Sequence, residues 1–370
     1  MRPFKLERYF AKYEFSAPYL LSASDCESLR LGELLELADP ETRRLWDGLS
    51  LGYTESPGHP LLREAIAGLC QVIRPADVLV AAPEEAIFIF MHSLLVPGDE
   101  VVALVPAYQS LHEVARAAGA RVLPWPLALT DSGWQIDLEG LGRLLSRRTR
   151  LVVLNFPHNP TGCLPSRREL EAVLALAERS GAYVFSDEMY RLLEYDPSRR
   201  LPAVCDLYQR GVSLAGMSKA LSLPGLRIGW LASQDRDLLR RCQEYKDYTT
   251  ICSSAPSEVL ALMAMRAKET ILARNLAIVQ ANLAVAEPFF ARHPGLLRWL
   301  PPQASSVAFP AWTGLGELEP FCHRLVERQG VMLVPGSLFD YPGAHFRLGL
   351  GRRNFPEALA RLDDELKLMG

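Results

Sequence analysis

Short apolar runs alternate with longer amphipathic segments through the middle of the 370-residue chain. Runs of this length are typical of strands buried on both faces, and the segments between them are typical of helices. We expect strands at Val78–Ala81, Val101–Val105, Arg121–Pro124, Leu151–Phe156, Tyr183–Ser186, Val212–Ala215 and Ile228–Ala232, with helices at Glu84–Leu95, Tyr108–Ala118, Arg167–Ser180 and Arg236–Tyr248. The alternation predicts an α/β fold with a mostly parallel, seven-stranded sheet covered by helices.

The pattern changes near residue 255. A long helical stretch is predicted first, followed by shorter elements: Ala255–Arg292, Val307–Trp312, a helix over Glu317–Gln329, Val331–Val334, His345–Leu350 and a last helix from Phe355. This order predicts a smaller α+β unit, against which the first forty residues would pack. We therefore expect a large domain over residues 41–255 and a small domain made of residues 1–40 and 256–370.

Composition argues against several classes of protein. Lys and Arg number 40 against 43 Asp and Glu, so the chain lacks the basic surplus of a nucleic-acid-binding domain. It has neither an apolar run of about 18 residues for a membrane span nor a secretory signal at its start. The seven cysteines form no C-x-x-C pair and the histidines no H-x-x-x-H pair, so we expect reduced thiols, a cytoplasmic location and no bound metal.

Lys219 follows the apolar run Val212–Ala215 and precedes the next predicted strand. Lysine is rarely buried without a function. Burial lowers the pKa of an amine and makes it a nucleophile that can form a Schiff base. Taken alone, a lysine on an exposed turn is the more common alternative.

Two further polar segments follow predicted strands directly. Asn159 belongs to the turn Asn155–Gly162, where an amide can donate to a ligand oxygen, and a plain loop is the alternative. Asp187 comes at the end of an apolar run, where a carboxylate needs a cationic partner such as a protonated ring nitrogen, and Tyr190 is three residues further on. A helix N-cap is the alternative role for Asp187.

The order and spacing of these segments resemble the fold-type I pyridoxal-phosphate enzymes, specifically the class I/II aminotransferases. The family pattern is N-P-T-G, then D-x-x-Y, then S-K followed eight residues later by R. The chain matches it at Asn159–Gly162, Asp187 with Tyr190, and Ser218-Lys219 with Arg227. Further matches extend the resemblance over nearly the whole chain: Tyr53–Gly58, Leu62–Ile66, Val96–Val101, Pro106–Tyr108, Val334–Ser337 and Arg347-Leu348.

The resemblance implies that pyridoxal 5'-phosphate is the cofactor and that Lys219 holds it as an aldimine. It implies catalytic roles for Lys219, Asp187 and Tyr190, with Asp187 paired to the ring nitrogen. The implied cofactor-binding residues surround the ring and the phosphate: Tyr53, Pro83, Glu84, Tyr108, Asn159, Asp187, Tyr190, Ser218, Lys219 and Arg227. Tyr53 matches a family tyrosine that reaches the phosphate across a subunit interface, so a homodimer is also implied.

Two positions depart from the family pattern at the phosphate. The expected phosphate-binding helix begins Ala82-Pro83-Glu84, and Pro83 has no N–H to donate. Gly216 stands three residues before Lys219, where the family commonly has Ser or Thr. These departures concern how the phosphate is held.

Arg347 matches the family arginine that binds the substrate's α-carboxylate, with Asn159 beside it. Alternation in His345–Leu350 places Arg347 opposite Phe346 and Leu348, and a surface arginine on an edge strand is the alternative. The resemblance thus implies transfer of an α-amino group between an amino acid and a 2-keto acid.

Other reactions, such as elimination and cyclisation, begin with the same aldimine. In residues 155–159, 218–230 and 247–250 the chain is especially similar to the capreomycidine synthase-like members, which perform elimination and cyclisation on a hydroxylated arginine. A non-catalytic effector domain of a regulator is an alternative from a different class. Substrate determinants are expected around residues 22–29, at His59 and near Tyr248, where Asp25 and Glu27 would suit a basic side chain or would be solvated loop charges.

Overall fold

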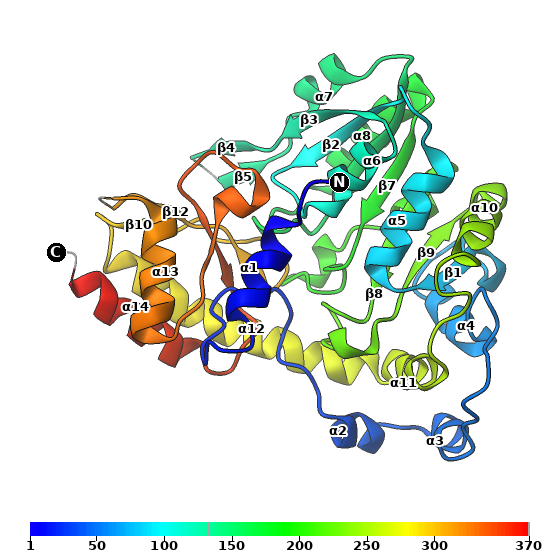
Figure 1. Cartoon of the computed structure of the whole chain (residues 1–370), viewed down its shortest axis with the longest axis horizontal. Coiled ribbons are helices and arrows are strands. Elements are labelled where there is room, and N and C mark those ends of the chain that lie inside the picture. Colours follow the sequence, from blue (N-terminus) through cyan, green and yellow to red (C-terminus); the bar gives the residue numbers. More distant parts are fainter. Residues whose placement is uncertain (132, 315, 369–370) are drawn as a thin grey trace.

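The computed structural model describes residues 1–131, 133–314 and 316–368. Its centre is a seven-stranded sheet in the order β1-β9-β8-β7-β6-β2-β3 (Figure 1). These strands are β1 (Val78–Ala81), β2 (Glu100–Val105), β3 (Arg121–Pro126), β6 (Thr149–Asn155), β7 (Tyr183–Asp187), β8 (Gly211–Gly216) and β9 (Gly229–Ser233). β9 pairs antiparallel with β1 and β8, and the other neighbours in the sheet are parallel. The prediction of a mostly parallel sheet is confirmed.

Helices cover both faces of this sheet because successive strand residues point to opposite sides. Leu79 and Val101 pack on one face with α5 (Pro83–Leu94), α6 (Ser110–Ala117) and α10 (Arg236–Lys246). Val80 and Val102 pack on the other face. That face is covered by α4 (Pro60–Ala67), α7 (Leu138–Leu144), α8 (Arg167–Ser180), α9 (Val204–Leu207) and α11 (Ala255–Arg266).

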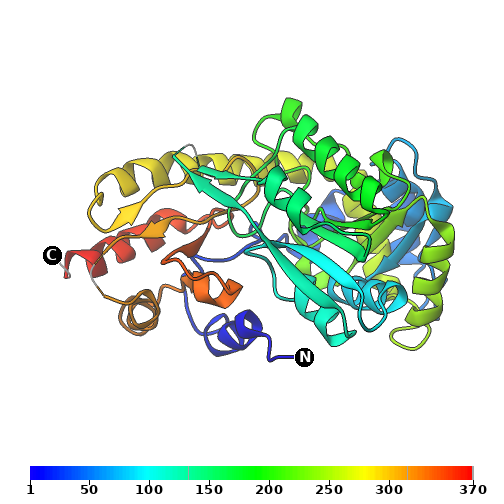
Figure 2. The ribbon, with the colours of Figure 1, turned by 90° about the horizontal axis from the view of Figure 1, so that it is seen from above.

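A second core lies beside the large sheet and is formed by the C-terminal part of the chain (Figure 2). Its helices are α12 (Lys268–Ala291), α13 (Leu318–Gln329) and α14 (Phe355–Lys367), packed on β11 (Val307–Ala308) and β14 (Phe346–Gly349), with β13 (Val334–Pro335) paired to β14. The remaining elements are α2 (Leu31–Glu36), α3 (Pro40–Asp47), β4 (Ala128–Thr130), β5 (Gly133–Gln135), β10 (Leu297–Arg298) and β12 (Ala311–Trp312). No helix among the described residues is both long and apolar enough to span a membrane.

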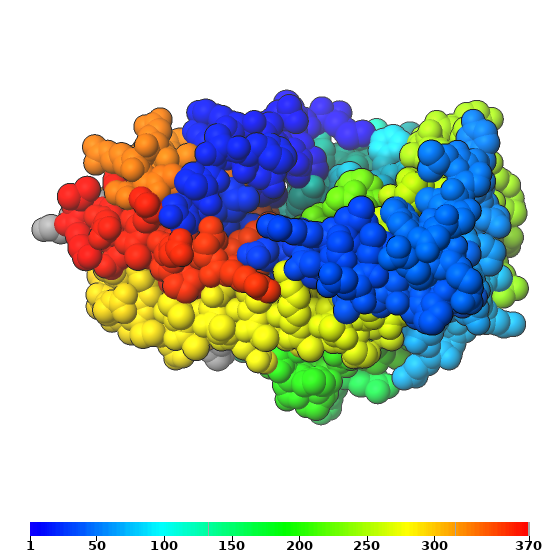
Figure 3. All heavy atoms as spheres, turned by 90° about the horizontal axis from the view of Figure 1, so that it is seen from below, coloured from blue at the N-terminus to red at the C-terminus, as the bar shows by residue number. Residues whose placement is uncertain are grey.

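The N-terminal segment lies against the C-terminal part of the chain, as the sequence predicted. Figure 3 shows the first residues (dark blue) next to the C-terminal segments (orange and red). Helix α1 (Lys5–Tyr13) is fixed there by Tyr9, whose hydroxyl donates to the Leu333 carbonyl at 2.8 Å, and by Lys5, which pairs with Asp340 at 2.6 Å. The division of the chain into two domains at residues 40 and 255 stays a prediction.

Three predicted elements differ from the structure. The long helix over Ala255–Arg292 is two helices, because Ala267 leaves the helical conformation and α11 and α12 pack into different cores. The strand over Val307–Trp312 is interrupted at Pro310, which has no N–H for the ladder, and its halves pair with different strands. In Val331–Val334 only the last residue belongs to a strand, and Val331 forms an isolated bridge to Tyr19.

Candidate active site

The polar residues that follow the strands meet at one edge of the sheet. Asn155 ends β6 and Asp187 ends β7, and the strand register places the two side by side. The Asn155 side-chain amide donates to the Asp187 carbonyl at 2.9 Å, while its oxygen accepts from the Asn159 N–H at 2.8 Å. These bonds fix the turn that carries Asn159 to the same edge as Lys219, which follows β8.

Asp187 is a buried carboxylate with few partners. One of its oxygens accepts from the Met189 N–H at 3.1 Å. Burial raises its pKa to about 7, and Lys219 is the nearby cation that opposes the rise. A cation beside this carboxylate, such as a protonated ring nitrogen, would therefore be strongly favoured.

Lys219 is held by the N-terminal segment. Its Nζ donates to the Ser24 hydroxyl at 2.8 Å, a contact that spans 195 positions of the sequence. Burial lowers the pKa of the amine, and Asp25 and Asp187 partly oppose this effect. Lys219 and Asp187 thus face the same site. Lys219 does lie on a turn after β8, but its side chain is only partly exposed and its amine is hydrogen-bonded.

Arg347 is buried in the same site, with 1% of its surface exposed. Its Nε donates to the Ser22 carbonyl at 3.0 Å, and one terminal nitrogen donates to Asn159 Oδ1 at 3.3 Å. The guanidinium carbon lies 5.6 and 5.4 Å from the ring centres of Phe10 and Phe339. The other terminal nitrogen has no partner among the described residues, so it is available for a carboxylate.

Among the buried hydroxyls that have no hydrogen-bond partner in the described part of the chain, two belong to residues predicted to bind the cofactor. These residues are Tyr190 and Ser218, and burial raises the pKa of Tyr190. Buried polar groups are normally bonded, so these two hydroxyls are available to a ligand. Tyr108 lies near Arg347, and its hydroxyl donates to Glu7 at 2.8 Å.

The start of α5 explains the first departure from the family pattern. Pro83 is the first helical residue, a position where the missing N–H removes no bond of the helix. Its ring leaves no room for a side chain at Gly229, whose Cβ would lie 2.9 Å from Pro83 Cγ. The N–H groups of Glu84 and Glu85 follow in the first turn, which a phosphate can bind.

Gly216 is explained by the close approach of β8 and β9. A Cβ at this position would lie 3.0 Å from both Gly229 Cα and the Ile228 carbonyl oxygen. Since backbone atoms cannot move aside easily, the Ser or Thr of the family pattern does not fit here without a shift of the sheet.

Two other residues that were predicted to bind the phosphate, Arg227 and Tyr53, lie at the surface. Arg227 is exposed, donates to the Pro224 carbonyl at 3.1 Å and lies near enough to Glu84 to lower the pKa of that carboxyl. Burial has the larger, opposite effect and raises the Glu84 pKa to about 7. Tyr53 is 91% exposed and does not enter this chain's own site.

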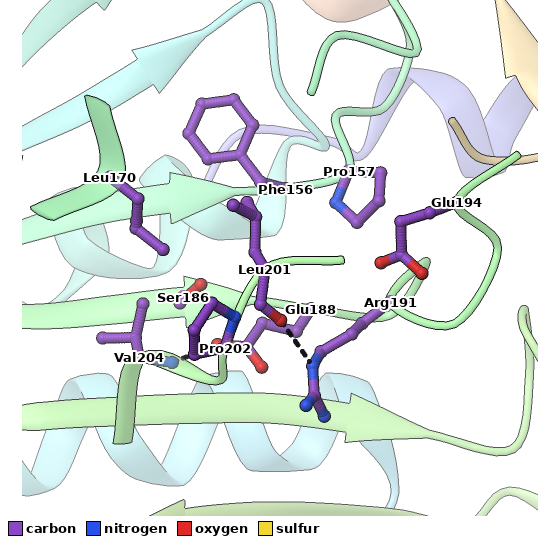
Figure 4. Close-up of a pocket in the computed structure, with 10 residues that line it drawn as sticks. All are labelled: Phe156, Pro157, Leu170, Ser186, Glu188, Arg191, Glu194, Leu201, Pro202 and Val204. Carbon is purple, nitrogen blue, oxygen red and sulfur yellow. Dashed lines mark hydrogen bonds between the residues drawn. The ribbon is translucent and has the colours of Figure 1, made fainter. Parts of the chain in front are cut away.

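The neighbouring carboxylate of Glu188 belongs to a different environment. Its Oε1 accepts from the Ser213 hydroxyl at 2.7 Å and from the Val204 N–H at 2.8 Å. Figure 4 shows Glu188 among the residues that line a small pocket, which also include Val204 and Leu170. The volume of this pocket, ≈ 10 Å³, is at or below what one water needs, so Glu188 has a structural role.

The expected substrate determinants fall into two groups. Asp25 is partly buried, pairs with Arg352 at 3.1 Å and faces Lys219. Glu27 is half-exposed and pairs with Arg353 at 3.6 Å, while Tyr248 is 91% exposed and lies outside the site.

The sequence prediction expected site residues around positions 22–29, which include Ser24, but it missed the contribution of helix α1. Ser24 binds Lys219, Glu7 binds Tyr108, and Phe10 lies against Arg347. The spacing of Glu7 and Phe10, which places them on one face of a helix, was the available signal. It does not by itself say what that face contacts.

Comparison with known proteins identifies the class. The family model of class I and II aminotransferases matches residues 21–362. Capreomycidine synthase of Streptomyces vinaceus is 34% identical over 368 residues, which is 98% of this chain and 93% of that protein. The chain belongs to the class I and II aminotransferase family.

Two solved structures extend this result. A pyridoxal-phosphate-dependent aminotransferase from Streptococcus suis 89-1591 superposes with a TM-score of 0.93 at 30% identity, covering 100% of this chain and 99% of the other. The pyridoxal-phosphate-dependent cyclase OrfR gives 0.91 at 30% identity, covering 100% and 98%. The chain is therefore an enzyme of this family with the type I fold, and its cofactor is pyridoxal phosphate.

Proposed function

We propose that this enzyme transfers an α-amino group from an amino acid to a 2-keto acid. The observation that carries the proposal is the meeting of Lys219, Asp187 and Arg347 in one buried site at the carboxyl edge of the sheet. Lys219 and Arg347 supply a nucleophilic amine and a cation for an α-carboxylate. A non-catalytic binder has no need of both.

The chain's own residues suit the cofactor. Asp187 would pair with its ring nitrogen, and Asn159 and Tyr190 would bind its phenolic oxygen. Tyr108 would stack on the ring. Its phosphate would be held by the N–H groups after Pro83, in particular those of Glu84 and Glu85, together with the following side chains: Ser218, Arg227 and Tyr53 of the partner subunit.

Pyridoxal phosphate, when bound, supplies an aldehyde for amines and a ring that withdraws electrons from the substrate's α-carbon. Lys219 would hold the cofactor covalently until a substrate amine replaces it. Its lowered pKa leaves the freed amine able to accept the α-proton and to return it at another carbon. Arg347 would fix the α-carboxylate, and so hold the α-hydrogen within reach of the Lys219 nitrogen.

Elimination with cyclisation is a second candidate. The full-length similarity to capreomycidine synthase and the structural similarity to the cyclase OrfR favour it. Both reactions need the same α-proton transfer by Lys219, so the residues of the site do not distinguish them.

Dependence on a keto acid separates the two candidates. The loaded enzyme would be mixed with a panel of amino acids, with and without 2-oxoglutarate or pyruvate, and the products measured by mass spectrometry. Transfer predicts one turnover per site without a keto acid and many with it. Repeated turnover without any keto acid would establish elimination or cyclisation instead.

We also propose a homodimer that completes the phosphate site. Two neighbouring segments, joined by a hydrogen bond from Thr54 to the Ser253 carbonyl, expose the large apolar side chains Leu51, Tyr53, Tyr248 and Ile251. Exposed apolar groups of this size are typical of interfaces. Sedimentation should give twice the mass of the chain, and a monomer that binds the cofactor fully would contradict the proposal. The cytoplasmic location stays a prediction from the cysteine pattern.

A further inference from the structure

Two cysteines that lie far apart in the sequence meet beside the large sheet. Cys70 lies just after α4 and Cys205 belongs to α9, and their sulfur atoms are 4.0 Å apart. The contact spans 135 positions of the sequence. A search for C-x-x-C spacing therefore does not find this pair, because only the packing of α9 next to the end of α4 creates it.

A carboxylate lies next to the two thiols. Asp206 follows Cys205, and its carboxylate forms a group with the two sulfur atoms in which all three ligand atoms lie within 4.8 Å of one another. Its Oδ1 accepts from the N–H groups of Gln71 and Val72 at 2.9 and 3.0 Å. Since these residues follow Cys70 directly, the two bonds fix the carboxylate beside that cysteine. Both bonds use Oδ1, which leaves Oδ2 for another partner.

The group formed by Cys70, Cys205 and Asp206, here called the thiol cluster, is anchored from inside. The Cys205 N–H donates to Ser213 Oγ at 3.1 Å, and the Cys205 carbonyl accepts from the Gln234 side-chain amide at 2.8 Å. Cys205 is 0% exposed, whereas Cys70 and Asp206 are half-buried. The cluster is thus held in place by the core and is reached from solvent past Cys70 and Asp206, so an ion has a path to it.

The ligand types and distances suit a thiolate-binding metal ion. Two sulfur atoms bound tetrahedrally to zinc at about 2.3 Å lie about 3.8 Å from each other, close to the observed 4.0 Å. A disulfide bond is about 2.05 Å long, so oxidation of the pair would require a movement of about 2 Å. Thiolate ligands select Zn²⁺ over Mg²⁺ and Ca²⁺, which prefer oxygen.

We propose that Cys70, Cys205 and Asp206 bind a divalent, thiolate-seeking metal ion of the Zn²⁺ type, with water as the fourth ligand. Binding replaces the two thiol protons, which pass to solvent, and the metal keeps its oxidation state. The ion would link the end of α4 to α9, and since it binds only where the three ligands meet, it would stabilise the folded chain. This inference does not depend on the proposed function.

Cadmium is the probe, because bonds between Cd²⁺ and thiolates absorb in the ultraviolet. The loaded enzyme is reduced, freed of metal with a chelator and titrated with Cd²⁺ alone, and Zn²⁺ is then added as a competitor. We expect one bound Cd²⁺ per chain, which Zn²⁺ displaces and a large excess of Mg²⁺ does not. Zn²⁺ should also raise the melting temperature of the protein by several degrees.

Variants then assign the binding to residues. Cys70→Ser should weaken Cd²⁺ binding about 100-fold and remove the stabilisation by Zn²⁺, because it deletes one of two thiolate ligands. Asp206→Asn should weaken binding about tenfold and keep the ultraviolet band, because both sulfur atoms remain. Cys252→Ser is the matched control, since Cys252 is also half-buried and lies outside the thiol cluster. It should bind Cd²⁺ as the wild type does.

Each result supports or overturns the assignment. Wild-type Cd²⁺ affinity in Cys70→Ser, or an equal loss in Cys252→Ser, overturns it. If the wild type binds no Zn²⁺ and dilute hydrogen peroxide removes two thiols that Cys70→Ser retains, the cysteines are a redox pair and the metal site is refuted. Circular dichroism without metal shows whether each variant is folded. If Cys70→Ser does not fold, Asp206→Asn decides, because wild-type affinity in that variant also refutes the site.

Discussion

Replacing Asp187 by Asn should have opposite effects on the cofactor-free protein and on the loaded enzyme. In the cofactor-free protein burial raises the pKa of Asp187 from 3.8 to about 7. Between these pH values the folded chain keeps a proton that the unfolded chain has released. The free energy of unfolding therefore falls as the pH rises through this window, and it is lowest above about pH 7.

The magnitude follows from the pKa change. About three pKa units correspond to roughly 4 kcal/mol, an upper value for this buried group. Asn does not titrate and can still accept the Met189 N–H. The Asp187→Asn protein without cofactor should match the wild type near pH 4 and melt several degrees higher at pH 8. Calorimetric melts across this range would measure the difference.

The loaded enzyme should lose activity, because Asn carries no charge to pair with the ring nitrogen of the cofactor. Removing one partner of a buried charge pair costs about 3–5 kcal/mol, which corresponds to roughly a 150- to 5,000-fold lower rate if the pair is needed in the transition state. Stopped-flow absorbance of the cofactor with a reactive amino acid would report the rate. The variant should therefore be more stable when empty and far slower when loaded.

Glu188→Gln is the matched control. Glu188 is the adjacent buried carboxylate, but its bonds to Ser213 and to the Val204 N–H belong to the small pocket of Figure 4. This variant should keep the cofactor's absorbance and its reaction rate within a few-fold. An Asp187→Asn enzyme with the wild-type rate, or a cofactor-free variant with the wild-type dependence of stability on pH, would refute the reasoning.

Four further substitutions test other parts of the site. Lys219→Ala should lower turnover at least about 1,000-fold and abolish the absorbance of the bound aldehyde, and a normal spectrum would contradict the assignment. Arg347→Gln should raise KM about 10- to 100-fold for an amino acid but leave the affinity for the cofactor unchanged in equilibrium dialysis. Arg227→Gln should weaken cofactor binding about 10- to 100-fold, with wild-type affinity excluding the phosphate role. Gly216→Ser should cost about 1–3 kcal/mol in denaturant unfolding because its Cβ would meet Gly229, and an unchanged midpoint would show that the sheet adapts.

Local patterns predicted most of the large sheet. The observed ends of its strands lie within about one or two residues of the predicted ends, because fully buried strands leave a continuous apolar run between turn residues. Prediction was weaker after residue 255. There the strands are two to four residues long, and packing against different cores broke the Ala255–Arg292 helix at Ala267.

The sequence by itself determined the residues that stand at the strand ends, since Lys219 and Asp187 follow apolar runs and parallel strands finish at one edge. Only the tertiary structure decided what surrounds them. Lys219 meets Ser24 across 195 positions, and Arg347 meets Ser22 across 325. Contacts over such separations depend on how two cores pack together. A local sequence pattern does not predict that packing. Glu7 and Phe10 of α1 became part of the site in this way.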